Sequence, residues 1–137
     1  MKYRLLNYIA CPYCKDPSFP LKLVVFEVRR YDERKLPEDM PRPLCDLYCG
    51  YLGKKIEELK KEGREPPCDE CIKYEVVAGI LICSICNRWY PIIDEIPRIL
   101  PDEYRNREED LRFLKQYADK VPEEIKLHGK PFNLSTT

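Results

Sequence analysis

Cys83-Ser84-Ile85-Cys86 carries the strongest structural constraint in this chain, and Cys11-Pro12-Tyr13-Cys14 repeats its spacing near the other end. Each Cys-x-x-Cys pair can hold two thiolates on one metal ion, and together the pairs supply the four sulfurs of a tetrahedral zinc site. Asn87, after the second pair, suits the left-handed backbone that often follows such a knuckle, whereas Lys15 suits it less. Four cysteine ligands leave no open coordination position, so the pattern favours a structural centre in a binding module.

The composition of the chain excludes several classes of protein. The chain has 137 residues, with 24 basic and 24 acidic side chains, which predicts one domain without the basic excess typical of nucleic-acid binding. Met1–Ala10 is too polar for a signal peptide, and the longest apolar run, 76–83, is too short to cross a bilayer. We therefore expect a cytoplasmic protein with no membrane contact, in which reduced thiols favour metal over disulfides.

Two alternatives to zinc are open for the four cysteines of the Cys-x-x-Cys pairs, called here the outer cysteines. Charged residues make up 35% of the chain and it holds a single glutamine, a bias seen in hyperthermophile proteins. Intracellular proteins of hyperthermophiles can contain disulfides, so disulfides are one alternative. A rubredoxin-type iron site, which also uses two Cys-x-x-Cys pairs, is another.

A second and less regular set of cysteines lies between the two pairs. Gly50 after Cys49 suits a knuckle, whereas Ile72 after Cys71 does not, because a β-branched residue resists a left-handed conformation. The pattern predicts a second zinc site, with disulfides or free thiols as alternatives. The members of this set are Cys45, Cys49, Cys68 and Cys71.

The order of the expected elements indicates an α+β fold with a small antiparallel sheet. We expect strands over Leu21–Arg30, Tyr74–Cys83 and Trp89–Ile93, with Gly79 marking a bend or bulge and a turn at Asp94-Glu95 leading into Ile96–Leu100. Helical spacing predicts a helix over 52–62 and another over 106–120, where Asn106 and Glu109 form a capping-box pattern.

These elements predict a domain organisation. Residues 1–30 and 74–101 form a zinc-binding domain over 1–101, with a cysteine-containing helical insertion at 31–73. A C-terminal helical extension follows at 102–127, and 128–137 is expected to be a flexible tail.

No residue pattern indicates catalysis. The single histidine, His128, lies in the expected tail, so a Ser–His or Cys–His pair cannot form in a packed core. Neither a phosphate-binding loop nor a dinucleotide fingerprint is present. We predict no catalytic residues and no small-molecule substrate.

The stretch 88–101 is the most apolar long stretch outside the knuckles, and its three prolines confine it to a sheet edge or to bulges. An edge of this kind is covered either by the C-terminal helix or by a partner protein whose sheet docks there. Alternation along a strand means that some of its side chains belong to the core. The candidate partner-binding residues are Trp89, Tyr90, Ile92, Ile93, Ile96, Ile99 and Leu100.

The segments 9–15 and 79–101 resemble the TRM-one-twelve family, the small zinc-containing activator subunits shared by several class I methyltransferases, in an archaeal-like form. The resemblance rests on both knuckles and on the Tyr90-Pro91-Ile92…Ile96-Pro97…Leu100 pattern, and it covers residues 3–30 and 74–101. It implies an α+β fold with zinc on Cys11, Cys14, Cys83 and Cys86.

The resemblance also implies a function and a partner. It implies a non-catalytic subunit that forms a heterodimer with S-adenosylmethionine-dependent methyltransferases acting on tRNA, rRNA or a translation release factor. Nucleic acid would then be reached only through the partner. The alternative from another class is a nucleic-acid-binding zinc ribbon of a polymerase or ribosome-associated complex.

The chain departs from the family pattern at three places. Glu95 stands where the family has Gly. Because positive φ costs a non-glycine residue about 1 kcal/mol or somewhat more, the turn is expected to differ in shape from that of the family. The four cysteines of the insertion and the helical extension after Pro101 are also additions to the pattern.

Overall fold

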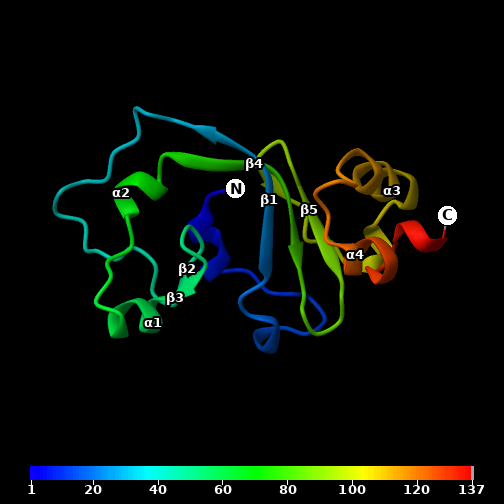
Figure 1. The fold of residues 1–137 in the computed structure, drawn as a ribbon, viewed down its shortest axis with the longest axis horizontal. Coiled ribbons are helices and arrows are strands. Elements are labelled where there is room, and N and C mark those ends of the chain that lie inside the picture. Colours follow the sequence, from blue (N-terminus) through cyan, green and yellow to red (C-terminus); the bar gives the residue numbers. More distant parts are fainter. Residues whose placement is uncertain (137) are drawn as a thin grey trace.

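The core of the protein is a four-stranded antiparallel sheet, seen in a computed structural model that describes residues 1–136 (Figure 1). The strand order is β1-β4-β5-β6, so the longest strand pair is formed by segments far apart in sequence. The strands are β1 (Lys22–Arg30), β4 (Tyr74–Ile82), β5 (Trp89–Ile93) and β6 (Ile96–Pro97). The α+β class and the small antiparallel sheet predicted from the sequence are confirmed.

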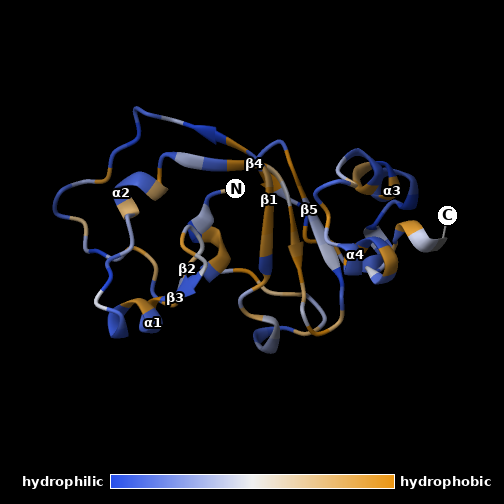
Figure 2. Cartoon of the chain, viewed as in Figure 1, coloured by the Kyte–Doolittle hydropathy of each residue, from blue (hydrophilic) through white to orange (hydrophobic). Residues whose placement is uncertain are grey.

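β4 is the central strand, and its composition explains its place. All of its residues after Tyr74 are buried, as expected for a β-branched strand paired on both sides. Apolar residues run along the sheet strands (Figure 2). At Gly79 a Cβ atom would come within 2.7 Å of the Val24 carbonyl oxygen. The register of β1 against β4 shifts between Val25 and Val28 beside this close approach, so the irregularity predicted at Gly79 lies on the facing strand.

The β5–β6 hairpin turns through Asp94 and Glu95, which have φ values of 50° and 70°. Two positive φ values in a two-residue loop match the right-handed twist of the flanking strands. The backbone N–H of Glu95 donates to the Val77 carbonyl at 3.0 Å, and the Tyr31 hydroxyl donates to the Glu95 carboxylate at 2.8 Å. These bonds offset the strain predicted for a non-glycine residue in this turn.

Each face of the sheet has its own cover. One face packs against the 3-10 helix η1 (Tyr3–Asn7) and the first knuckle, around Leu6, Leu81 and Tyr90. The other face packs against the C-terminal extension, around Trp89 and Leu114. Both faces of β4 and β5 are therefore covered within the chain, whereas most of β1 is exposed.

The C-terminal extension contains α3 (Arg107–Gln116) and α4 (Glu123–His128). The Asn106 side chain accepts the Glu109 backbone N–H at 3.0 Å, which confirms the predicted helix cap. The ring of Phe113 in this helix stacks on the indole of Trp89 in β5, with 5.9 Å between the ring centroids. The helix ends four residues before the predicted limit, because Tyr117 leaves helical geometry.

The segment 128–137, predicted to be a flexible tail, makes long-range hydrogen bonds to β5 within the residues that the structure describes. Trp89 donates its indole N–H to the Phe132 carbonyl at 2.9 Å and its backbone N–H to Lys130 at 3.1 Å. Gly129 allows this approach, since a Cβ there would lie 2.9 Å from Trp89 Cδ1. No local sequence pattern predicts these long-range hydrogen bonds. Thr137 lies outside the described residues.

The insertion forms a separate lobe beside η1 (Figure 1). It contains the hairpin β2 (Tyr48–Cys49) and β3 (Lys54–Lys55), then α1 (Ile56–Lys61) and α2 (Cys68–Cys71). The helix predicted over 52–62 is four residues shorter at its start, because Leu52 lies in the hairpin turn. Its end before Gly63 is confirmed, since Gly63 has a φ of 68°.

Candidate metal centre

The four outer cysteines meet at one end of the sheet. Cys11 and Cys14 come from the turn after η1, and Cys83 and Cys86 come from the β4–β5 connection. Their four Sγ atoms all lie within 4.8 Å of one another, with Cys11 and Cys83 buried and the other two half-buried. The grouping predicted from the two Cys-x-x-Cys pairs is confirmed.

The two turns share a backbone geometry that directs both cysteines of each pair inward. Lys15 donates its N–H to the Cys11 carbonyl at 2.8 Å, and Asn87 donates to Cys83 at 3.0 Å. Both residues have positive φ, 53° at Lys15 and 61° at Asn87. Lys15 thus has a positive φ, which its residue type disfavours. The Ser18 hydroxyl stabilises this conformation by donating to the Lys15 carbonyl at 2.6 Å.

The sulfur positions fit a tetrahedral thiolate centre. A zinc–sulfur distance of about 2.3 Å places the corners of a tetrahedron about 3.8 Å apart. The Cys11 and Cys86 sulfurs are 3.8 Å apart. A disulfide needs sulfurs about 2.05 Å apart, and all eight cysteines are free thiols in the structure. The donor set is all sulfur, which suits a soft or borderline cation such as zinc.

Hydrogen bonds to the sulfurs form a second layer of contacts. Burial acts to raise the pKa of the Cys86 thiol, but bonds from the backbone and guanidinium of Arg88 and from Cys83 and Cys14 lower it to about 7. The Tyr90 hydroxyl lies 3.2 Å from the Cys11 sulfur. Burial raises the pKa of Tyr90, so its hydroxyl keeps the proton that it can donate to a thiolate.

Arg88 connects this centre to the C-terminal extension. Its guanidinium lies 3.8 Å from the centroid of the Tyr13 ring in the first knuckle. It also donates to both carboxylate oxygens of Asp102, with the shortest contact at 2.8 Å. The sequence prediction missed these contacts, although a cation two residues after Cys86 is a signal that could have been used.

The candidate partner-binding residues between Trp89 and Leu100, called here the partner strip, include both buried and exposed side chains. Ile96 is 60% exposed and Leu100 is 42% exposed, and Ile93 and Ile99 are half-buried. Trp89, Tyr90 and Ile92 are each 0% exposed, so these three candidate residues belong to the core of this chain, as the sequence analysis expected for some members. Both faces of β5 are covered within the chain, so strand alternation sends no side chain of 89–92 to solvent.

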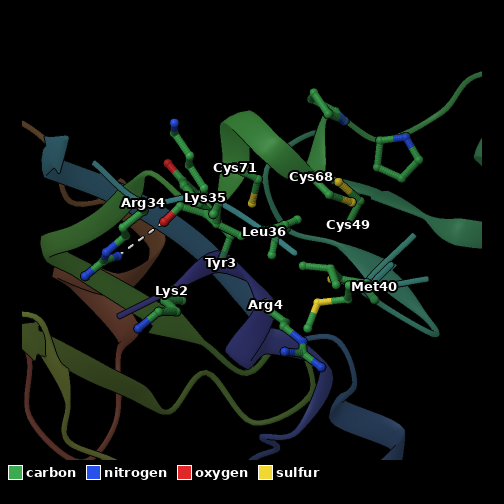
Figure 3. Close-up of a pocket in the computed structure, with 16 residues that line it drawn as sticks. Lys2, Tyr3, Arg4, Arg34, Lys35, Leu36, Met40, Cys49, Cys68 and Cys71 are labelled. Carbon is green, nitrogen blue, oxygen red and sulfur yellow. Dashed lines mark hydrogen bonds between the residues drawn. The ribbon is translucent and has the colours of Figure 1, made fainter. Parts of the chain in front are cut away.

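The inner cysteines share one cavity but are less closely grouped. Among the residues that the structure describes, only the outer set has its sulfurs within 4.8 Å of one another. Cys45, Cys49, Cys68 and Cys71 all line a cavity of about 320 Å³ between η1 and the insertion (Figure 3).

The geometry defines a class of protein, an α+β module whose sheet is closed at one end by a four-cysteine cluster that could hold a metal ion. The model of the Trm112p-like family matches residues 2–95, more than half of the chain. The chain therefore belongs to the Trm112p-like family, whose members are non-catalytic activators of methyltransferases. No curated protein matches it.

The match ends at the β5–β6 turn, so the extension from 102 onward lies outside the family model. None of the helices formed by residues 1–136 is long and apolar enough to cross a membrane.

Proposed function

We propose that this chain is a zinc-binding, non-catalytic subunit that forms a heterodimer with class I, S-adenosylmethionine-dependent methyltransferases. The observation that carries this proposal is the family membership of residues 2–95. The proposed substrates of the complex are tRNA, rRNA or a translation release factor, reached through the methyltransferase in the cytoplasm. The chain itself has equal numbers of acidic and basic side chains, which favours a protein partner over direct binding to nucleic acid.

Zinc is the proposed ion because the centre consists of four thiolates in a near-tetrahedral arrangement. A tetrathiolate zinc site has no open position for substrate or water, so its role is structural. In this chain it would hold the first knuckle against the β4–β5 connection, which lie about 70 residues apart in sequence. The position of η1 on the sheet then depends on the metal.

The proposed docking surface lies along β6, the end strand of the sheet. Ile96 and Leu100 are exposed there, and a groove of about 540 Å³ is lined in part by Glu95 and Pro97, the neighbours of Ile96. Apolar Leu5, Tyr8 and Pro97 line this groove, and Tyr8 is 62% exposed. The lining also includes four charged residues: Lys2, Arg4, Glu75 and Glu95. A methyltransferase that covered this surface would bury apolar side chains beside an open strand edge.

Affinity purification of the tagged chain from its native cells tests the proposal. Extracts are treated with nuclease and washed at rising salt, and the retained proteins are identified by mass spectrometry. We expect a class I methyltransferase to remain bound at high salt, because burial of apolar surface is not screened by ions. Retention of nucleic acid alone, lost steeply as salt rises, would instead support the zinc-ribbon alternative.

A further inference from the structure

The four cysteines of the insertion are the largest group of metal-ligating side chains outside the first centre. Cys49 and Cys68 are buried and Cys45 and Cys71 are half-buried. They come from three places, the loop before β2, the hairpin β2–β3 and the helix α2. In the close-up, the labelled cysteines surround one cavity that opens beside Tyr3 and Met40 (Figure 3).

The turn after Cys49 has the backbone geometry of a metal knuckle. Gly53 donates its N–H to the Cys49 carbonyl at 2.8 Å and has a φ of 70°. Lys15 and Asn87 make the same bond with the same sign of φ in the two knuckles of the outer centre. In addition, the backbone N–H of Leu52 lies 3.4 Å from the Cys49 sulfur and points a donor at it. Such a bond stabilises a thiolate rather than a thiol.

α2 supplies the second pair of sulfurs. Cys68 and Cys71 are three residues apart at the two ends of α2, so their side chains lie on one face of it. Arg42 fixes this helix from the preceding loop, with two hydrogen bonds to the Asp69 carboxylate at 2.6 and 3.0 Å. Both pairs of cysteines are therefore held by defined backbone elements around the same cavity.

The charge of the cavity suits an anionic centre. Four thiolates around a divalent cation carry a net negative charge, and nearby cations stabilise it. Its lining contains the four cations Lys2, Arg4, Arg34 and Lys35 and, among the residues described, no carboxylate. Lys2 and Arg34 also contact Glu75, at 3.0 and 2.9 Å.

We propose that Cys45, Cys49, Cys68 and Cys71 form a second binding site for a thiophilic divalent cation, with zinc as the ion that their chemistry favours. The ion would draw the β2–β3 turn and α2 together across the cavity, because the four sulfurs stand farther apart than those of the outer centre. It would fix the insertion against η1 without contributing to the sheet. The site is independent of the proposed methyltransferase partner.

The test compares the metal content of full-length protein purified under reducing conditions without chelator. We expect about two zinc ions per chain in the unaltered protein and about one in the double variant Cys49→Ser/Cys71→Ser. Met40→Leu, which changes a sulfur-containing side chain of the same cavity, should keep both ions. Equal zinc content in the unaltered protein and the double variant would overturn the proposal.

Cobalt titration of the unaltered protein, after its zinc has been removed under reducing conditions, gives a result that does not depend on whether the variant folds. Thiolate-to-cobalt charge-transfer absorption should rise until about two equivalents are added. A rise that stops at one equivalent would overturn the second site. An intact mass that increases by about two hydrogens per bridge on reduction would do the same, since it would show the inner cysteines to be disulfides.

Discussion

The guanidinium of Arg88 contacts the Cys86 sulfur, the Tyr13 ring and the Asp102 carboxylate, so one side chain joins both knuckles to the extension. Removing it takes a donor from one ligand and leaves Asp102 without its cation. Arg88→Met keeps the length of the side chain but not its charge. Mutation of residues that hydrogen-bond to metal ligands typically lowers the affinity for the metal by about 10–100-fold.

We therefore expect Arg88→Met to lower the affinity for zinc by about 10–100-fold. The measurement is competition with a chromogenic chelator, compared with Arg112→Met, an exposed arginine on α3. Equal zinc affinity in the two variants would show that the Arg88 contacts do not support the centre.

Glu75 is the acidic residue that joins the insertion to the sheet. Burial acts to raise the pKa of its carboxyl group, but hydrogen bonds from the N-terminal ammonium, Lys2 and Arg34 lower this pKa to about 2. A lowered pKa means that the ionised form stabilises the folded state above the unfolded pKa near 4.5, and that this contribution is lost as pH falls toward 2.

Glu75→Gln should accordingly lower the free energy of unfolding by about 2–3 kcal/mol at neutral pH. The difference from the unaltered protein, measured by urea unfolding, should persist down to about pH 5 and shrink only below that. A difference that already disappeared between neutral pH and pH 5 would contradict the assigned role of the carboxylate.

At the scale of elements, α3 depends on its first turn. The Asn106 side chain accepts the Glu109 N–H, and three acidic residues follow in the first turn, where the helix dipole favours them. Asn106→Ala should lower the free energy of unfolding by about 1 kcal/mol, while Asn106→Asp, which keeps the acceptor, should change it little. Thermal unfolding of the three proteins measures this, and equal losses in both variants would exclude capping as the cause.

The elements that were predicted well from the sequence are those that residues close together in the chain determine. β5 and its turn follow from a continuous apolar run and a two-residue break, and α3 follows from its cap. The start of α1 was misplaced because Leu52 fits helical spacing, yet its backbone N–H points at the Cys49 sulfur in a hairpin turn.

The burial of Trp89 and the contacts of the last segment of the chain share one physical cause. Trp89 donates to Lys130 and Phe132, about 40 residues away along the chain, so the segment after α4 covers β5 through contacts that no local pattern encodes. The outer cysteine centre could be predicted because its spacing is itself the signal. The contacts of Arg88 and Tyr90 with that centre depend on tertiary packing.

At the scale of the whole molecule, the outer centre joins the N-terminal knuckle to the end of the sheet. Structural zinc contributes about 10–16 kcal/mol of apparent binding free energy at neutral pH, more than the total stability of most domains. We expect a strong chelator to unfold the protein cooperatively and added zinc to restore it. Circular dichroism checks this, and an unchanged spectrum in protein shown to be metal-free would contradict a structural role for the ion.

The proposed complex is tested most directly by methyl transfer from labelled S-adenosylmethionine, catalysed by the co-purifying methyltransferase with and without this chain. We predict no transfer by the chain alone, a strong increase when it joins the methyltransferase, and loss of that increase with Ile96→Asp. That variant should unfold like the unaltered protein because Ile96 is 60% exposed, whereas Ile92→Ala, at a buried position, should lower stability by about 2–5 kcal/mol. Methyl transfer that was equal with and without the chain would contradict the account.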